Sequence, residues 1–150
     1  MNDYTVSMAQ RVPGACREEK GQDFASSLPG LILQELSDAE SYLYLGRILP
    51  GPESIRLREL ARQEQSHGAC LRGISTLITG QPAESPVLPP EPGQPVAVLR
   101  SCYGNTMRRL ARYEQYRVHP EYGPVFGKLA MQEQEHCREI LELIGRISRT

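Results

Sequence analysis

Two Glu-x-x-His motifs constrain the fold of this chain more than any other feature of its sequence. Glu64 with His67 forms one, Glu133 with His136 forms the other, and each lies in a long helical pattern of apolar residues. Residues three apart project from the same side of an α-helix, so each motif can bring a carboxylate and an imidazole to one point in a bundle core. The two motifs together predict a metal site inside a helical bundle.

Four segments have the periodicity of amphipathic helices: 28–49, 53–79, 96–118 and 124–147. The second and fourth align as an internal repeat, in which Glu64 falls on Glu133 and the two motif histidines coincide. We expect a pseudo-two-fold axis to relate the two halves of the chain. That symmetry puts both motifs at the same depth of one core.

The connection between the second and third segments is rich in proline. Its prolines are Pro82, Pro86, Pro89, Pro90, Pro92 and Pro95. They exclude a helix and favour an extended path, which at about 3.1 Å per residue reaches roughly 50 Å and can return along a helix of about 35 Å. The other two connections are short. This order of connections is that of a ferritin-like antiparallel four-helix bundle with one long crossover, so we predict an all-α chain of that architecture.

The length of 150 residues fits a single domain. Residues 1–27 show no periodicity and contain a turn signal at Pro13-Gly14. We therefore predict an N-terminal extension over 1–27, either an arm or loosely ordered, followed by the bundle over 28–150. The sequence does not disclose the role of this extension.

Composition and charge narrow the partners and the location. The formal net charge is −1 without a basic stripe or tail, which argues against nucleic acid as a partner. No apolar run approaches the roughly 20 residues of a membrane span, and the N-terminus lacks the residue order of a signal peptide. The four cysteines include no Cys-x-x-Cys pair, which suits reduced thiols. We expect a cytoplasmic protein that is not inserted in a membrane.

A symmetric two-metal site of this kind takes one further glutamate from each of the other two helices. Glu64 lies about thirteen residues after the turn at Pro50-Gly51, so a ligand at the same level of the bundle should lie about as far before that turn. In the first segment this is the stretch from Glu35 to Glu40. Glu35 lies near the centre of the apolar face, whereas Glu40 lies on its flank beside Arg47. We predict Glu35 as a ligand and Tyr42, two turns further along the same face, as a residue beside the site.

In the third segment the same depth rule points near Met107, where the sequence has no carboxylate. Glu114 is the only glutamate of this segment and lies about 10 Å nearer the next turn, so it reaches the site only if the helix is kinked. Tyr103 faces the expected site and is a second residue beside it. Four arginines are expected on a solvated face: Arg108, Arg109, Arg112 and Arg117.

The chain resembles the rubrerythrin branch of the ferritin-like superfamily over about residues 28–147. The resemblance rests on Glu35 with Tyr42 and on the two Glu-x-x-His motifs. It implies a non-haem di-iron centre in which Fe(II) is oxidised by peroxide or dioxygen. The ligands that it implies are Glu35, Glu64, His67, Glu133 and His136. The chain departs from the family because its third segment lacks the central glutamate, no second glutamate follows it, and no rubredoxin domain supplies electrons.

From these residues we predict a metal-binding oxidoreductase of the peroxidase or ferroxidase type. Mixed imidazole and carboxylate ligands suit two transition-metal ions, iron first, with manganese or zinc as alternatives. The electron donor is unknown and the oligomeric state stays open, a homodimer among the alternatives. A second hypothesis is a ferritin-like bundle with an incomplete metal site that acts as a binding or assembly module. A third, iron storage, requires a closed cage.

Overall fold

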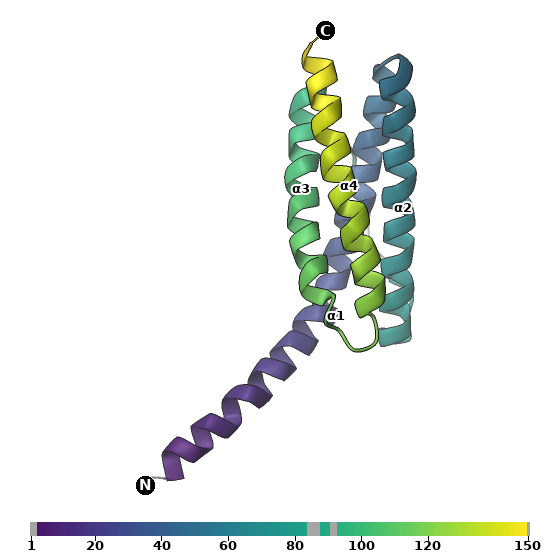
Figure 1. Cartoon of the computed structure of the whole chain (residues 1–150). Coiled ribbons are helices and arrows are strands. Elements are labelled where there is room, and N and C mark those ends of the chain that lie inside the picture. Colours follow the sequence, from purple (N-terminus) through teal and green to yellow (C-terminus); the bar gives the residue numbers. More distant parts are fainter. Residues whose placement is uncertain (1–2, 84–87, 91–92, 150) are drawn as a thin grey trace.

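The computed structural model describes the backbone of residues 3–83, 88–90 and 93–149, and the side chains of the same ranges from residue 24 onward. Within these residues all regular structure is helical, and four helices pack as a bundle (Figure 1). The helices are α1 (Asp3–Ile48), α2 (Gly51–Thr79), α3 (Pro95–Tyr116) and α4 (Gly123–Ser148). The predicted all-α, four-helix architecture is confirmed.

Proline and glycine set the ends of the helices. Pro52, Pro95 and Pro124 lie in the first turns of α2, α3 and α4, where the missing N–H removes no helical hydrogen bond. Gly80 caps the end of α2 in a left-handed conformation (φ 74°), and its N–H donates a hydrogen bond to the carbonyl oxygen of Thr76 at 2.8 Å. The predicted end of the first helix, and both predicted ends of the other three helices, lie within two residues of the observed ones.

The second and third helices run in the same direction along the bundle, as the colours of Figure 1 show. α1 packs mainly against α2, and α3 packs mainly against α4. Because α2 and α3 run in the same direction, the end of α2 and the start of α3 lie at opposite ends of the bundle. Residues 84–87 and 91–92 of the connection over residues 80–94 lie outside the described residues, and the predicted extended path of the proline-rich crossover falls in part on them.

The core consists of two apolar clusters with a polar layer between them. The first cluster includes Phe24, Leu28, Ile32, Leu71, Ile74, Tyr113, Phe126 and Ala130. The second cluster includes Ala39, Leu45, Leu57, Leu60, Leu99, Cys102, Ile140 and Leu143. The polar layer consists of eight buried residues, two from each helix: Glu35, Asp38, Glu64, His67, Thr106, Arg109, Glu133 and His136. All four helices therefore turn polar side chains inward at one level.

The first helix begins at Asp3, well before the predicted start at residue 28. The predicted turn at Pro13-Gly14 lies inside this helix, and the N-terminal part leaves the bundle as a helical arm (Figure 1). The arm was predicted, but its helical form was not. Among the described residues, none of the four helices combines the length and the apolar character that crossing a bilayer requires.

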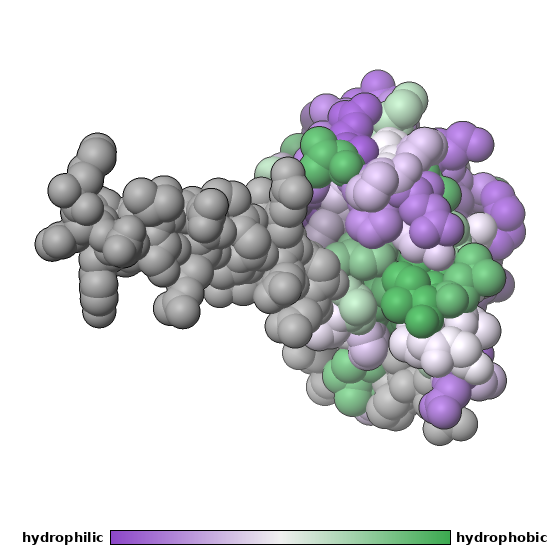
Figure 2. Space-filling view, turned by 90° about the horizontal axis from the view of Figure 1, so that it is seen from below, coloured by the Kyte–Doolittle hydropathy of each residue, from purple (hydrophilic) through white to green (hydrophobic). Residues whose placement is uncertain are grey.

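The bundle core begins before the predicted boundary at residue 28. Phe24 is buried, and its ring lies edge-on to Tyr116 and Phe126 at centroid distances of 5.1 and 5.5 Å. Apolar side chains are also exposed at the ends of α2 and α3, namely Leu77, Ile78 and Val118. Figure 2, which views the bundle from this end, shows hydrophobic residues in the middle of the face and hydrophilic residues around them.

Gly123, the first residue of α4, lies close to the backbone of the preceding turn. A β-carbon at this position would lie 2.3 Å from the carbonyl oxygen of Arg117. We expect Gly123→Ala to lower the free energy of unfolding by about 1–3 kcal/mol, because the backbone has to shift. The matched variant Gly145→Ala meets no atom within 4 Å and should raise that free energy by about 0.5–1 kcal/mol. Urea unfolding measures both, and equal effects would contradict this account of the turn.

Candidate metal centre

Both Glu-x-x-His motifs point into the polar layer. One ligand atom from each of Glu64, His67, Glu133 and His136 lies within 4.8 Å of the other three. All four residues are buried, and the two imidazole rings stack with their centroids 5.3 Å apart. The prediction that α2 and α4 bring both motifs to one depth is confirmed.

The inner nitrogen of each histidine faces a glutamate of the opposite helix. His67 Nδ1 lies 3.2 Å from Glu133 Oε1, and His136 Nδ1 lies 2.5 Å from Glu64 Oε1. Each motif thus reaches across the interface between α2 and α4 to the carboxylate of the other. This exchange is the geometry that the internal repeat in the sequence produces.

The outer nitrogen of each histidine faces a glutamine of the opposite helix. His67 Nε2 lies 2.5 Å from Gln132 Oε1, and His136 Nε2 lies 2.5 Å from Gln63 Oε1. An amide oxygen accepts a hydrogen bond, so Nε2 carries the hydrogen when the ring is neutral, and Nδ1 presents its lone pair to the interior. Sequence reasoning missed both glutamines, although they occupy equivalent places in the repeat, each one residue before its motif.

We expect the double variant Gln63→Leu/Gln132→Leu to bind Co(II) about 10- to 100-fold more weakly, because the two rings lose the partners that orient them. The matched control is Gln65→Leu/Gln134→Leu, which changes two exposed glutamines on the same helices. Competition with a chelator of known affinity measures the dissociation constant of each variant. Equal constants for the two double variants would show that the glutamines do not orient the rings.

The first helix contributes two carboxylates to the layer. Glu35, the predicted ligand, is fully buried, with Oε2 at 3.6 Å from His67 Nδ1. Its Oε1 accepts a hydrogen bond of 2.6 Å from the hydroxyl of Tyr113. Asp38, one turn further along, is also buried and was not predicted. Tyr42 is buried as expected beside the layer, where it belongs to the second cluster.

Arg109 is the largest departure from the sequence prediction. It was expected on a solvated face, but its guanidinium is fully buried in the polar layer. Nη1 donates a hydrogen bond to Asp38 Oδ2 at 2.7 Å, and Nη2 donates one to Glu64 Oε2 at 2.9 Å. Nε lies 3.3 Å from Glu35 Oε1 and 3.5 Å from Glu133 Oε1. The third helix therefore supplies a fixed positive charge at the level where a carboxylate was sought.

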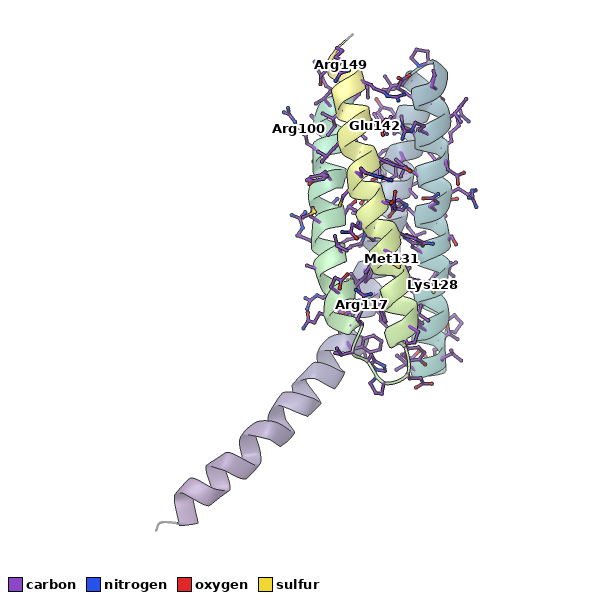
Figure 3. All side chains as sticks on the ribbon, viewed as in Figure 1. Arg100, Arg117, Lys128, Met131, Glu142 and Arg149 are labelled. Carbon is purple, nitrogen blue, oxygen red and sulfur yellow. The ribbon has the colours of Figure 1, made fainter. Side chains whose placement is uncertain are left out.

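The two other side chains predicted from the third helix lie elsewhere. Glu114 is exposed and pairs with Arg117 at 3.0 Å, so it does not reach the polar layer. Arg117 and the other charged side chains labelled in Figure 3 lie on the outside of the bundle. Tyr103 is partly buried and packs against the second cluster. The tyrosine of α3 that reaches the polar layer is Tyr113, through its hydrogen bond to Glu35.

Burial and mutual repulsion shape the charges of the three glutamates. Burial raises the pKa of Glu64 well above its ordinary value, and the charges of Glu35 and Glu133 add to this effect. Burial and the charge of Glu35 raise the pKa of Glu133 to about 7. Burial would also raise the pKa of Glu35, but the positive charge of Arg109 holds it well below its ordinary value. The layer has an excess of acidic groups that a proton or a metal ion can offset.

The two stacked histidines differ in charge. Burial favours the neutral form of His67, but hydrogen bonds with Glu133 and Glu35 overcome this effect and raise its pKa to about 10. Burial, together with the charge of His67, lowers the pKa of His136 to about 4. At neutral pH one ring is therefore protonated and the other is neutral, so that His136 can offer a lone pair without first releasing a proton.

Several buried polar atoms of the layer have no hydrogen-bond partner among the described residues. They include Glu35 Oε2, Glu64 Oε1, Glu133 Oε2 and His136 Nδ1; the contact of 2.5 Å between Glu64 Oε1 and His136 Nδ1 does not have the geometry of a hydrogen bond. Such atoms are rare in folded proteins, because leaving them unpaired costs free energy. Carboxylate oxygens and an imidazole nitrogen are all ligands of first-row transition metals. The residues of α1, α2 and α4 therefore fit a metal ion.

A groove between α2 and α4 leads from the surface to the outer edges of the histidines. Its volume is about 390 Å³. Its lining residues are Arg62, Gln63, Ser66, His67, Gln132, Glu135, His136 and Glu139. The groove is the access route from solvent to the polar layer on this side of the bundle.

Comparison with models of protein families, with curated proteins and with solved structures finds no match to this chain. A function for the chain therefore rests on the residues of the polar layer.

Proposed function

We propose that the chain is a rubrerythrin-like member of the ferritin-like bundles, which binds iron in its polar layer for redox chemistry with peroxide or dioxygen. One observation carries the proposal: Glu35 Oε2, Glu64 Oε1, Glu133 Oε2 and His136 Nδ1 are buried in the same layer and, among the described residues, make no hydrogen bond, although Glu64 Oε1 and His136 Nδ1 lie 2.5 Å apart. A cation bound to these atoms offsets the cost of burying them unpaired. The parallel course of α2 and α3 supports the ferritin-like order of connections.

Iron in this layer would supply one-electron redox chemistry that the side chains lack. The chain's own residues would hold and shield it. His67 and His136 present Nδ1 inward because Gln132 and Gln63 face their outer nitrogens. Tyr113 fixes one oxygen of Glu35 by a hydrogen bond, which leaves the other oxygen free to bind. The groove between α2 and α4 admits a small oxidant to this side of the layer.

Metal content per chain tests the proposal first. Protein made in iron-supplemented cells and purified without a chelator should contain iron by elemental analysis. Adding peroxide or air-saturated buffer to the Fe(II)-loaded protein should then give Fe(III), followed by its ultraviolet absorbance. Protein that contains no transition metal, and that takes up none on titration with Fe(II) under anaerobic conditions, would refute the proposal.

Metal affinity should rise with pH, because bound metal displaces a proton from His67. The pKa of His67 in the metal-free protein is raised to about 10 by its hydrogen bonds with Glu133 and Glu35, which outweigh burial. Below that pKa the ring holds a proton that a metal has to displace, so the apparent affinity should rise about tenfold per pH unit between about pH 7 and about pH 8.5. Calorimetry in buffers of different ionisation enthalpy measures the released proton. An affinity independent of pH over this window would contradict the account.

A second candidate function is a bundle without metal that serves as a binding or assembly module. The observation that favours it is Arg109, whose guanidinium offsets part of the negative charge of the layer without any metal. The same elemental analysis separates the two functions, since an assembly module needs no metal. Light scattering adds a readout for this candidate, because a module of this kind should form a defined oligomer or complex.

A further inference from the structure

We infer that the polar layer binds one metal ion per chain, because the guanidinium of Arg109 occupies the position that a second ion would take. The inference rests on the proposed function, in that it concerns the number of metals bound in the same layer. It goes beyond the motifs, since two Glu-x-x-His pairs by themselves predict two metals. The inference follows from how the carboxylate oxygens divide between Arg109 and the unpartnered side of the layer.

Three glutamates each turn one oxygen toward Arg109 and the other toward the motif histidines. Glu35 Oε1, Glu64 Oε2 and Glu133 Oε1 lie at 3.3, 2.9 and 3.5 Å from guanidinium nitrogens. The second oxygen of each, Glu35 Oε2, Glu64 Oε1 and Glu133 Oε2, has no hydrogen-bond partner among the described residues. A carboxylate that bridges two cations has this arrangement, with one oxygen on each. In this chain one of the two cations is the guanidinium.

The guanidinium is held firmly in this position. Its Nη1 donates a hydrogen bond of 2.7 Å to Asp38 Oδ2, and Nη2 lies 3.4 Å from the hydroxyl of Thr106. The side chain is fully buried. Because arginine does not lose its proton in proteins, this charge is permanent and repels a second metal ion at short range.

The unpartnered side of the layer is complete enough for one ion. It offers the second oxygen of each of the three glutamates together with His136 Nδ1, which lies 2.5 Å from Glu64 Oε1 without the geometry of a hydrogen bond. His67 Nδ1 lies 3.2 Å from Glu133 and 3.6 Å from Glu35 Oε2, so it borders the same space. The site is therefore of the single-metal class, with carboxylate and imidazole ligands and a fixed positive charge beside it.

Titration of the metal-free, full-length protein with Co(II), followed by its visible absorbance and by calorimetry, counts the ions. The wild-type chain should take up one Co(II) per chain. Arg109→Glu replaces the guanidinium by a carboxylate and should take up two. Arg108→Glu is the matched control, because the neighbouring Arg108 is exposed and donates a hydrogen bond to Asn105, outside the polar layer. This variant should take up one ion.

Each outcome bears on a different claim. Two Co(II) ions in the wild-type chain would overturn the inference and leave the proposed function standing, whereas no uptake of Co(II) or Fe(II) would refute both. One ion in Arg109→Glu would show that the guanidinium does not set the number of ions. Circular dichroism reports whether this variant folds when it is made in metal-supplemented medium. If it does not fold, Arg109→Gln takes its place, and the wild-type count still decides between one ion and two.

Discussion

Replacing Arg109 by methionine should remove a large part of the stability of the metal-free protein at neutral pH. The change leaves Glu35, Asp38, Glu64 and Glu133 facing one another in a buried layer without their common cation. Removing one partner of a buried ion pair costs about 3–5 kcal/mol, against a total stability of about 5–15 kcal/mol for an ordinary domain. Urea unfolding in the presence of a chelator measures the loss.

The matched control for this variant is Arg108→Met, which changes an exposed arginine at the next position and should alter the free energy of unfolding by less than about 0.5 kcal/mol. A divalent metal should restore much of the stability of Arg109→Met, because it supplies positive charge to the same carboxylates. Equal stability of the two variants in chelator would mean that the guanidinium does not hold the layer together.

Glu64→Gln should weaken metal binding by more than about 100-fold. This effect exceeds the loss of about 10- to 100-fold that is expected when a residue that only orients a ligand is removed. The amide keeps the shape of the side chain but removes the charge and one of the free oxygens that face the metal position. Glu59→Gln on the same helix is the control, because Glu59 is half exposed and pairs with Arg62 on the surface. Chelator competition with Co(II) gives both constants, and an unchanged affinity of Glu64→Gln would mean that metal binds somewhere else.

The Glu-x-x-His motifs could be predicted from the sequence because helical spacing alone brings their side chains together. Glu64 and His67 share one side of α2, and the repeat in the sequence places Glu133 and His136 at the same depth. Glu35 was found by the same geometry, from its depth and its place on the apolar face of α1. In each case the prediction needed only the position of a residue along a helix and around it.

Arg109 was missed because its charge was interpreted as a sign of exposure, and Asp38 because only glutamates were considered as ligands from the first helix. Asp38 follows Glu35 at the same three-residue spacing as the histidines follow their glutamates, so the pattern was present. Arg109 continues a buried stripe of α3 at spacings of three and four, which is Leu99, Cys102, Thr106, Arg109, Tyr113 and Tyr116. A charged residue on such a stripe is buried when oppositely charged groups meet it. Sequence reasoning about one helix does not supply the groups on the others.

The helical form of residues 3–23 could not be predicted from the pattern of the sequence. Periodicity reports the burial of one face of a helix, and the projecting arm of α1 lies away from the bundle in Figure 1. The internal Pro13-Gly14 also favoured a turn over a helix. The start of the bundle core at Phe24 was missed for a related reason, since a single aromatic residue does not form a periodic pattern of apolar residues.

The polar layer also limits how the two helical hairpins, α1 with α2 and α3 with α4, can be aligned. Apolar side chains of similar size can replace one another in a core with little loss of free energy, so the two clusters alone would tolerate a shifted pairing. A slip of one helical turn, about 5.4 Å, would take Arg109 away from Asp38 and Glu64 and leave all three charges buried without partners. The ion pairs therefore fix the register of the two hairpins, because only one alignment keeps all of these charges paired.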